Sequence, residues 1–327
     1  MSDQNLKMWD LIICGGGPSG LTAAMYAGRT NMSVLLIDKG ALGGVMNITD
    51  KIANYMGFPD AVGGIELATL FSRHALKYIS SDNTLFDTVT ELSVSPDDVN
   101  VKFVKIENQS FKCHSAIIAT GATPKLLSVE NHNKWFGRGL SYCAICDGAF
   151  FNGKPVVVVG GGNAAVEEGI FLTRFASKVT VIHRRNELRA SPIVQEEAFS
   201  NPKMEFAWDS VVVSLHGEPV LEEVEIENVK TCERSRIKAN GLFVYIGSTP
   251  NTDFVKVQGI KTNQDGYIQT DENMNVGVPG LFATGDVRDF PLRQISISCG
   301  NGAVAALMAE RYLHELKRQG IYRGTEN

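Results

Sequence analysis

The chain has 327 residues, of which 44% are hydrophobic, and its formal net charge at pH 7 is −5. This size allows a large core divided into two domains, and the slightly acidic balance gives no electrostatic reason to expect nucleic acid or an anionic membrane as a partner. The first ten residues lack the apolar stretch of a signal peptide, and the six scattered cysteines form no disulfide framework, so we expect a cytoplasmic protein.

The chain begins with a predicted strand, glycine-rich turn, helix and second strand. An apolar strand over 10–14 leads into Gly15-Gly-Gly-Pro-Ser-Gly20, and a helix over 21–30 and a strand over 34–37 follow. The glycines and the proline favour this interpretation over a membrane span, although the surrounding run carries no charge. Strand, turn, helix and strand in this order are typical of a dinucleotide-binding unit.

The glycines of this turn would let the backbone approach a pyrophosphate at the helix N-terminus, where unpaired N–H groups and the helix dipole favour anions. Asp38 closes the second strand, at the position where a carboxylate accepts hydrogen bonds from the ribose hydroxyls. A carboxylate there would repel a 2′-phosphate. We therefore expect FAD or NAD at this turn rather than NADP.

A single Cys-x-x-Cys pair, Cys143 and Cys146, follows in the middle of the chain. The two intervening residues let the sulfurs close a small reversible ring, and such pairs commonly have one thiol of lowered pKa. Asp147 is next to the pair and is a candidate proton donor and acceptor. Zinc is the alternative, but it normally needs a second pair of ligands at compatible spacing, and Cys113 and Cys232 are isolated in the sequence. We predict no metal site.

The dinucleotide pattern then occurs a second time. A strand over 155–159 leads into Gly160-Gly-Gly-Asn-Ala-Ala165, and a helix over 166–175 and a strand over 179–182 follow. In both copies 23 positions separate the first glycine from the residue that closes the second strand, from 15 to 38 and from 160 to 183. Either glycine pattern alone is a weak signal, but two in matching context are a strong one.

The second copy ends in basic residues, His183-Arg184-Arg185, with Arg189 four residues further on. Guanidinium groups at this position suit a ribose 2′-phosphate through charge-assisted, often bidentate hydrogen bonds. The alternative is a solvated basic turn. Two nucleotide sites with one dithiol indicate electron flow from a nicotinamide through a flavin to a disulfide.

Two strands that end in Gly/Pro turns, 116–124 and 242–250, predict that the chain crosses between domains near 120–126 and 247–254. Between the second crossing and the C-terminus we expect a turn-rich stretch, a short strand and a closing helix over 302–319.

The predicted fold class is α/β, with two Rossmann-like dinucleotide-binding domains. The NADPH domain, 123–250, carries the dithiol and is inserted into a discontinuous FAD domain. The first part of the FAD domain is 1–122, and the second part is 251–327.

Taken together, these motifs resemble those of the low-molecular-weight thioredoxin reductases over essentially the whole chain. The matching segments are Gly15–Gly20, Asn54–Pro59, Ala119–Pro124, Ser141–Gly148, Gly160–Glu168, His183–Arg185 with Arg189, Thr284–Asp286, and Arg293-Gln294. The resemblance implies FAD in the discontinuous domain, NADPH in the inserted one, and thioredoxin as the protein substrate. It also implies a homodimer, to which residues 251–327 are expected to contribute contacts.

The resemblance also implies roles for individual residues. Cys146 would face the flavin, Cys143 would exchange with thioredoxin, and Asp147 would be the acid/base. The residues implied for FAD are Gly15, Gly17, Pro18, Ser19, Gly20, Asp38, Gly43, Gly44, Asn54, Thr120, Gly121, Gly285, Asp286, Arg293, Gln294 and Ile295. Those implied for NADPH are Gly160, Gly162, Asn163, Ala164, Ala165, His183, Arg184, Arg185 and Arg189.

The order of the motifs has a mechanical consequence. Cys146 precedes Gly160 by only 14 residues, so the disulfide and NADPH would belong to one domain and the flavin to the other. We expect the inserted domain to alternate about the two crossings between hydride transfer and exposure of Cys143. Alternatives are a reductase driven by ferredoxin or flavodoxin, a reductase of another dithiol protein, and a flavin redox sensor.

Overall fold

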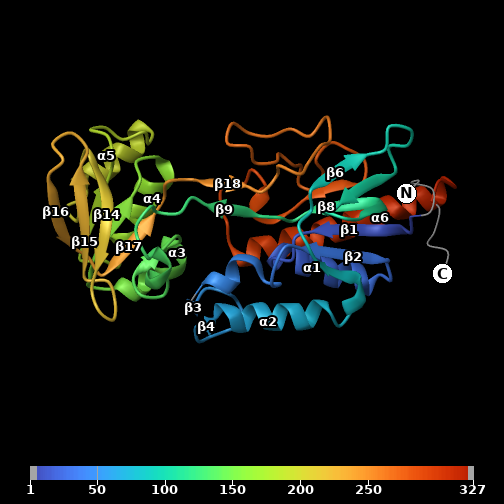
Figure 1. Cartoon of the computed structure of the whole chain (residues 1–327), viewed down its shortest axis with the longest axis horizontal. Coiled ribbons are helices and arrows are strands. Elements are labelled where there is room, and N and C mark those ends of the chain that lie inside the picture. The colour runs from blue at the N-terminus through green and yellow to red at the C-terminus, as the bar shows by residue number, and fades with distance from the viewer. Residues whose placement is uncertain (1–5, 50, 323–327) are drawn as a thin grey trace. The chain divides into compact units, whose positions relative to one another are not determined.

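The computed structural model describes residues 6–49 and 51–322, which form two compact units (Figure 1). The first unit comprises Met1–Ile48, Tyr55–Thr123 and Thr249–Asn327, and the second comprises Thr49–Asn54 and Pro124–Ser248. Thr49–Asn54 differs from the sequence prediction, which placed this segment in the first domain.

The two main crossings lie in strands β9 (Ala122–Pro124) and β18 (Ser248–Pro250), which pair with each other. Just inside the first unit, the Asn251 amide N–H donates to the Gly121 carbonyl at 3.0 Å, and the Thr123 hydroxyl donates to Asn251 Oδ1 at 2.9 Å. The chain therefore leaves and re-enters the first unit at neighbouring points, within both of the stretches expected from the sequence.

The first unit is built on a seven-stranded sheet. Its strand order is β5 (Thr84–Phe86), β2 (Val34–Asp38), β1 (Met8–Cys14), β8 (Ser110–Ile118), β7 (Lys102–Lys105) and β6 (Glu91–Val94), with β19 (Leu281–Ala283) also pairing with β8. The pairings among β5, β2, β1, β8 and β19 are parallel, whereas β8–β7 and β7–β6 are antiparallel.

Successive side chains of β1 point to opposite faces of this sheet and pack against different elements. Leu11 and Ile13 face helices α1 (Pro18–Arg29) and α6 (Ile295–Arg318), whereas Ile12 and Cys14 belong to the core on the opposite face. All four side chains are fully buried. Helix α2 (Gly64–Ala75) packs against α1, as Figure 1 shows, so the helices form one layer. A strand buried on both faces reads as a continuous apolar run, as this one does.

The second unit has a five-stranded parallel sheet with the order β10 (Leu140–Ser141), β17 (Gly241–Val244), β11 (Pro155–Val159), β12 (Lys178–Ile182) and β13 (Met204–Ala207). Val156 and Val158 pack with α4 (Asn163–Leu172) and α5 (Pro192–Ser200), while Val157 and Val159 pack toward an antiparallel sheet. That sheet consists of β14 (Ser210–His216), β15 (Glu223–Asn228) and β16 (Arg234–Lys238).

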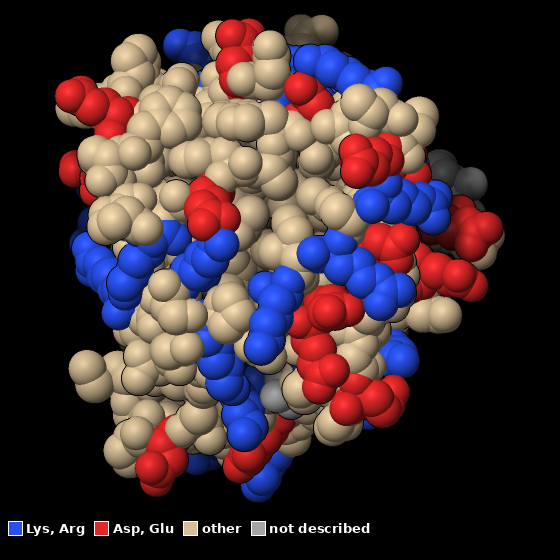
Figure 2. Space-filling view, turned by 90° about the vertical axis from the view of Figure 1, so that its left-hand side faces the viewer, with Lys and Arg blue, Asp and Glu red and all other residues tan. Residues whose placement is uncertain are grey.

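The outer surface of the second unit mixes charges of both signs. Arg234 lies 2.8 Å from Glu227, and Arg236 lies 3.3 Å from Glu223, across strands β15 and β16. Figure 2 shows Lys and Arg interspersed with Asp and Glu over the face that it draws. Opposite charges therefore alternate on this face.

The two units repeat one arrangement, which confirms the predicted α/β fold with two Rossmann-like units. In each, the strand that precedes a glycine turn, β1 or β11, pairs in parallel with the strand that ends beside Asp38 or His183. A third parallel strand, β5 or β13, follows in the same order. The remaining elements are β3 (Lys51–Ile52), β4 (Val62–Gly63), α3 (Ala144–Asp147), and the 3₁₀ turns Gly44–Ile48, Ser81–Asn83, His132–Trp135, Gly148–Phe151 and Gly285–Val287.

Three helices begin earlier than the sequence predicted. Helices α1 and α4 begin at Pro18 and Asn163, inside the glycine motifs themselves, and α6 begins at Ile295 rather than at residue 302. The Ser- and Gly-rich start of α6 has low helix propensity, but a Cβ on Gly302 would collide with the Ser19 carbonyl of α1. Close packing against α1 therefore outweighs local propensity.

Among the described residues, no helix combines the length and apolar composition needed to cross a membrane.

Candidate functional site

The first glycine turn depends on backbone conformations and contacts that only glycine allows. Gly15 has a φ of 111°, and its N–H donates to the Ile37 carbonyl at 2.7 Å. A Cβ on Gly15 would collide with the Ala119 carbonyl, and one on Gly20 would collide with the Gly15 carbonyl. Helix α1 begins directly after Gly17, which makes no side-chain cap, so its first N–H groups face the turn.

Asp38 closes this turn from the end of β2. Its Oδ2 accepts the Gly16 N–H at 2.6 Å and its Oδ1 accepts the Gly40 N–H at 2.8 Å. Each carboxylate oxygen keeps a further lone pair. The carboxylate is therefore fixed beside the turn and can still accept hydrogen bonds from ribose hydroxyls.

A cavity of about 210 Å³ adjoins the turn within the first unit. The sequence analysis assigned Gly15, Asp38 and Thr120 to this site but missed the residues that follow β5 and β18. The residues after β5 could have been predicted if a third parallel strand had been recognised beside β2, since the ends of neighbouring parallel strands meet at one edge of the sheet. The lining residues are Gly15, Ile37, Asp38, Lys39, Asp87, Thr88, Val89, Thr120, Asn251, Asp253 and Phe254.

The loop containing Gly43 and Gly44 lies against the same turn. The Gly43 N–H donates to the Gly16 carbonyl at 2.8 Å, and a Cβ on Gly44 would lie 3.1 Å from Gly17 Cα. Both loop glycines have positive φ, 120° and 57°. The structure thus brings together three of the predicted glycines, Gly17, Gly43 and Gly44, and adds Gly16, which was not predicted.

The segment after β19 reaches the N-terminus of α1 from another direction. A Cβ on Gly285 would lie 2.6 Å from Ser19 Oγ, and the Ser298 hydroxyl donates to Asp286 Oδ1 at 3.4 Å. Burial raises the pKa of Asp286, while the positive charge of Arg293 opposes that rise. The buried Thr284 hydroxyl has no hydrogen-bond partner among the described residues, as expected for a group that meets a ligand.

The remaining residues predicted for FAD fall in three places. Thr120 donates to the Asn251 carbonyl at 2.6 Å beside Gly121, whose φ is 66°. Arg293 lies over the Tyr267 ring, and Gln294 and Ile295 begin α6. Asn54 belongs to the second unit and is not brought to this site by the fold of the first. Apart from Asn54, the residues predicted for FAD all belong to the first unit.

The second glycine turn repeats the geometry of the first. Gly160 has a φ of 147° and donates to the Ile182 carbonyl at 3.1 Å, as Gly15 does to Ile37. The Gly161 carbonyl accepts the Arg189 N–H at 2.6 Å. Helix α4 begins at Asn163, whose Oδ1 accepts the Ser191 N–H at 2.7 Å.

His183 packs over this turn. Its ring fills the space that a Cβ on Gly161 would need, and its buried Nε2 has no hydrogen-bond partner among the described residues. Burial and then the charges of Arg189, Arg185 and Arg184 lower the pKa of His183, so the ring is neutral at neutral pH.

Arg184, Arg185 and Arg189 are exposed, and none of them forms an ion pair with a carboxylate within residues 6–49 and 51–322. A Cβ on Gly162 would lie 4.0 Å from Arg189 Nη2, so this guanidinium borders the turn. Three unpaired cations beside a helix N-terminus fit an additional phosphate. Of the two predicted alanines, Ala164 is exposed, whereas Ala165 is buried and its Cβ packs against Gly160.

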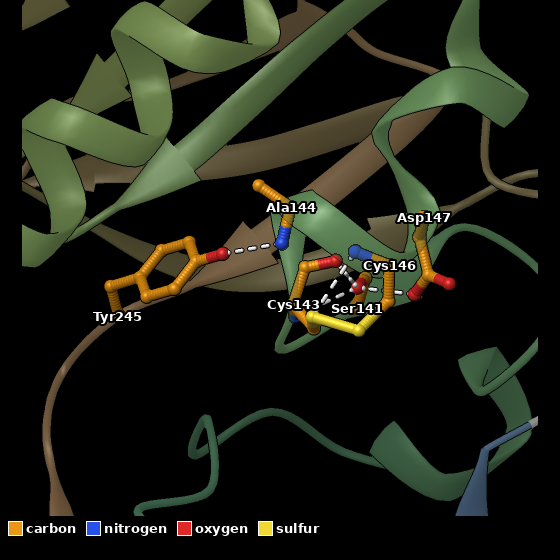
Figure 3. The surroundings of a disulfide bond; sticks show 6 residues. All are labelled: Ser141, Cys143, Ala144, Cys146, Asp147 and Tyr245. Atoms are coloured by element: carbon orange, nitrogen blue, oxygen red, sulfur yellow. Dashed lines mark hydrogen bonds between the residues drawn. A yellow bond between two sulfur atoms is a disulfide. The ribbon is translucent and has the colours of Figure 1, made fainter. Parts of the chain in front are cut away.

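Cys143 and Cys146 form a disulfide, in the same unit as the second glycine turn (Figure 3). Cys143 precedes the short helix α3, and its Sγ accepts the Cys146 N–H at 3.2 Å. An N–H donor directed at this sulfur would stabilise a thiolate there after reduction. Among the described residues, no group of three or more His, Cys, Asp and Glu side chains is arranged to hold a metal ion.

Ser141 and Tyr245, which the sequence analysis did not assign, hold the disulfide segment. The Ser141 hydroxyl donates to Asp147 Oδ2 at 2.5 Å and accepts the Cys143 N–H at 3.0 Å. The Tyr245 hydroxyl accepts the Ala144 N–H at 2.6 Å from the other side, as Figure 3 shows. Ser141 ends β10 and Tyr245 follows β17, so both come from adjacent strand ends at one edge of the sheet.

Comparison with known proteins shows the family to which the chain belongs. The protein-family model described as "Pyridine nucleotide-disulphide oxidoreductase" matches residues 9–306. A thioredoxin reductase of Bacillus subtilis (strain 168) is 43% identical over 312 residues, which is 95% of this chain and 96% of the relative. The crystal structure of thioredoxin reductase from Streptococcus pyogenes MGAS5005 is 43% identical, with a TM-score of 0.89 and coverage of 95% of this chain and 100% of that one.

A second solved structure, the Lactococcus lactis thioredoxin reductase titled "FR conformation", is 40% identical with a TM-score of 0.61, over 94% of this chain and 100% of that one. These matches confirm the family resemblance that the motifs indicated. The chain, with two glycine turns and one disulfide, belongs to the pyridine nucleotide-disulphide oxidoreductase family.

Proposed function

We propose that the protein is a thioredoxin-disulfide reductase, which uses NADPH and FAD to reduce the Cys143–Cys146 disulfide and, through it, oxidised thioredoxin. The observation that carries this proposal is the disulfide itself, formed by the Cys-x-x-Cys pair in the unit of the second glycine turn. The high identity to thioredoxin reductases over almost the whole chain supports thioredoxin as the substrate. When bound, FAD supplies hydride acceptance from NADPH and electron transfer to the disulfide.

The residues around the disulfide transfer the proton that the exchange with thioredoxin requires. Reduction of the disulfide takes two electrons and two protons and leaves the thiols of Cys143 and Cys146. Asp147 takes the proton of the Cys143 thiol, and the resulting thiolate attacks the thioredoxin disulfide and forms a mixed disulfide. Asp147 then returns that proton to the thioredoxin thiolate that is released. Attack by Cys146 then restores the Cys143–Cys146 bond and releases the second thiol. Ser141 holds the Asp147 carboxylate for this transfer.

The two nucleotides are assigned by charge. Asp38 beside the first turn disfavours a 2′-phosphate, which suits FAD in the first unit. Arg184, Arg185 and Arg189 beside the second turn favour that phosphate, which suits NADPH in the second unit. The division of flavin and disulfide between two units also supports alternation between two domain orientations.

Rapid-mixing spectrophotometry of the oxidised flavoprotein tests the electron donor. We expect NADPH to bleach the flavin rapidly, NADH to do so far more slowly, and reduced ferredoxin to have no advantage over NADPH. Efficient bleaching by ferredoxin with negligible bleaching by NADPH would contradict the NADPH assignment and favour a protein donor. Turnover with thioredoxin, followed as NADPH oxidation, separates a reductase from a redox sensor that completes only one slow cycle.

The homodimer is also part of this proposal. Tyr26 in α1 and Ile65 and Leu70 in α2 are apolar and 45%, 66% and 39% exposed. Tyr26 also lines a cavity of about 350 Å³ that residues of α1, α2 and the start of α6 form. Burial of this face against a second copy would remove apolar surface from water. Light scattering should show a dimer for the native protein and a monomer for the Ile65→Glu variant. If the Ile65→Glu variant remained a dimer, the interface would have to lie on another face.

The thiols support a cytoplasmic location. Cys14 and Cys113 are buried and reduced, and Cys232 and Cys299 are also free. Free thiols outside a redox-active pair are typical of a reducing compartment.

A further inference from the structure

Tyr245 has a fixed backbone at the edge of the second sheet. Its N–H donates to the Val159 carbonyl at 2.8 Å, at the end of β11. A Cβ on Gly160 would lie 2.5 Å from the Tyr245 carbonyl oxygen, so the residue also abuts the second glycine turn. With its main chain held on both sides, the side chain starts from a defined point and reaches the disulfide segment.

The contact that it makes there is with the backbone between the two cysteines. The Tyr245 hydroxyl oxygen lies 2.6 Å from the Ala144 nitrogen and accepts its N–H. Ala144 is 1% exposed, so water cannot replace this acceptor readily. Helix α3 has only four residues and cannot be stable by itself, so its conformation depends on contacts of this kind.

The amide groups of the segment are divided between three acceptors. Ser141 takes the Cys143 N–H, and Tyr245 takes the Ala144 N–H. The Cys146 N–H is then directed at Cys143 Sγ at 3.2 Å. The orientation of this last donor requires α3 to keep its turn, and Tyr245 holds the first helical residue of that turn.

The surroundings keep the Tyr245 hydroxyl neutral. Burial raises the pKa of Tyr245, and the charges of Glu168 and Asp147 raise it further. Glu168 is itself half-buried, and its Oε2 has no hydrogen-bond partner among the described residues. A neutral phenol acts as a constant acceptor over the pH range in which a thiol titrates.

We propose that Tyr245 is a positioning residue for the redox disulfide: by holding the Ala144 amide it orients the Cys146 N–H toward Cys143 Sγ and stabilises the Cys143 thiolate of the reduced protein. The proposal rests on the proposed role of this pair in thiol–disulfide exchange. It adds Tyr245, which lies 101 positions after Ala144 in the chain, to the control of Cys143 reactivity.

Tyr245→Phe tests this, because it removes the hydroxyl and keeps the ring. The control is Tyr142→Phe, since the Tyr142 hydroxyl also accepts a backbone N–H, that of Leu127 at 3.2 Å, but holds no amide of the disulfide segment. The flavin-loaded protein is reduced with dithiothreitol, freed of it, and alkylated with iodoacetamide across pH 5–10, with modification at Cys143 quantified by peptide mass spectrometry.

We expect the midpoint of Cys143 alkylation to rise by about half to one pH unit in Tyr245→Phe, a roughly three- to tenfold slower reaction below the midpoint, and to stay unchanged in Tyr142→Phe. An unchanged or lowered midpoint in Tyr245→Phe, or an equal shift in both variants, would overturn the proposal.

Hydrogen–deuterium exchange separates positioning from folding. In Tyr245→Phe, the peptide that contains Ala144 should lose protection, while peptides from β11 and α4 should keep it. Loss of protection throughout the second unit would assign Tyr245 to folding alone and would also overturn the proposal. Neither measurement uses thioredoxin or NADPH, so a wild-type protein that fails to reduce thioredoxin would refute the proposed function without deciding this point.

Discussion

At the scale of single residues, charge distinguishes two turns that are otherwise alike. Gly15 and Gly160 have the same kind of backbone conformation and the same hydrogen bond to the neighbouring strand. The difference is Asp38 at one turn and the exposed arginines at the other. In the proposed assignment of FAD to the first turn and NADPH to the second, coenzyme selectivity therefore depends on these few side chains.

Replacement of Arg184 by Ala should raise KM for NADPH roughly ten- to a hundredfold, because one charge-assisted hydrogen bond to the 2′-phosphate is lost. KM for NADH, which lacks that phosphate, should be unchanged. Steady-state kinetics with both nucleotides measures the effect, and Arg174→Ala, a change in the same unit that leaves the basic turn intact, is the control. Equal losses for NADPH and NADH would argue against phosphate recognition.

Lys102 is a charged residue in the core of the first unit. It is fully buried, and its ammonium group donates to the His114 carbonyl at 2.8 Å and to the Tyr312 hydroxyl at 3.2 Å. Burial lowers its pKa to about 8, against 10.5 for an exposed lysine. Between these values the unfolded chain binds more protons than the folded chain, so this residue makes stability rise with pH from about 8 to 10.5.

Over that window the free energy of unfolding contributed by Lys102 should increase by about 3 kcal/mol. Other groups titrate there too, so the measurement is the difference in unfolding free energy between the native protein and Lys102→Met at each pH. We expect the advantage of the native protein to grow as pH rises from 8. A difference that is constant between pH 7 and 10 would mean that Lys102 titrates normally.

At the scale of secondary-structure elements, contact between α1 and α6 positions the first nucleotide site. Gly302 of α6 lies against the Ser19 carbonyl, at the N-terminal end of α1. Gly285, in the 3₁₀ turn that follows β19, lies against the Ser19 side chain. The two helices thus bring the first glycine turn and the Thr284–Asp286 segment to one place, and small residues make this approach possible.

Gly302→Ala should therefore destabilise the first unit by roughly 1–3 kcal/mol through overpacking and weaken FAD retention. Gly300→Ala is a matched control in the same helix, since a Cβ at Gly300 meets no atom within 4 Å and alanine favours a helix. Thermal unfolding and flavin absorbance after dialysis are the readouts. If the two variants retained the same amount of flavin and unfolded at the same temperature, the close contact between α1 and α6 would not be needed to form this site.

At the scale of the whole molecule, one unit is inserted into the other through strands β9 and β18. Because these strands pair, the first unit is nearly continuous across Thr123 and Thr249, and its two ends are tied through Asn251. Such an insertion separates the folding of the two units, which stay joined through β9 and β18 and through the two ends of the Thr49–Asn54 segment.

Replacement of residues 124–248 by a short Gly/Ser linker should accordingly leave a protein that folds and binds FAD. It should lack the disulfide and the basic turn, so NADPH should not bleach its flavin. Flavin absorbance and circular dichroism test folding, and rapid mixing with NADPH tests reduction. A colourless or unfolded product would show that the first unit needs the inserted one.

The sequence by itself determined the two glycine turns, the strands beside them, the dithiol and the family, because these depend on local pattern: glycine where the chain needs positive φ, and apolar runs where strands are buried on both faces. The two crossings could also be located, from Gly/Pro turns after strands. Local pattern could not predict the early start of α6, since that depends on packing against α1.

Only the tertiary structure decided which distant residues share a site. Asp253 meets Asp38 at one cavity, Tyr245 meets Ala144 across 101 positions, and Asn54 falls in the second unit. The contact between Tyr245 and Ala144 arises because the parallel strands β10 and β17, far apart in the chain, end at the same sheet edge, an arrangement set by strand order and not by any one segment.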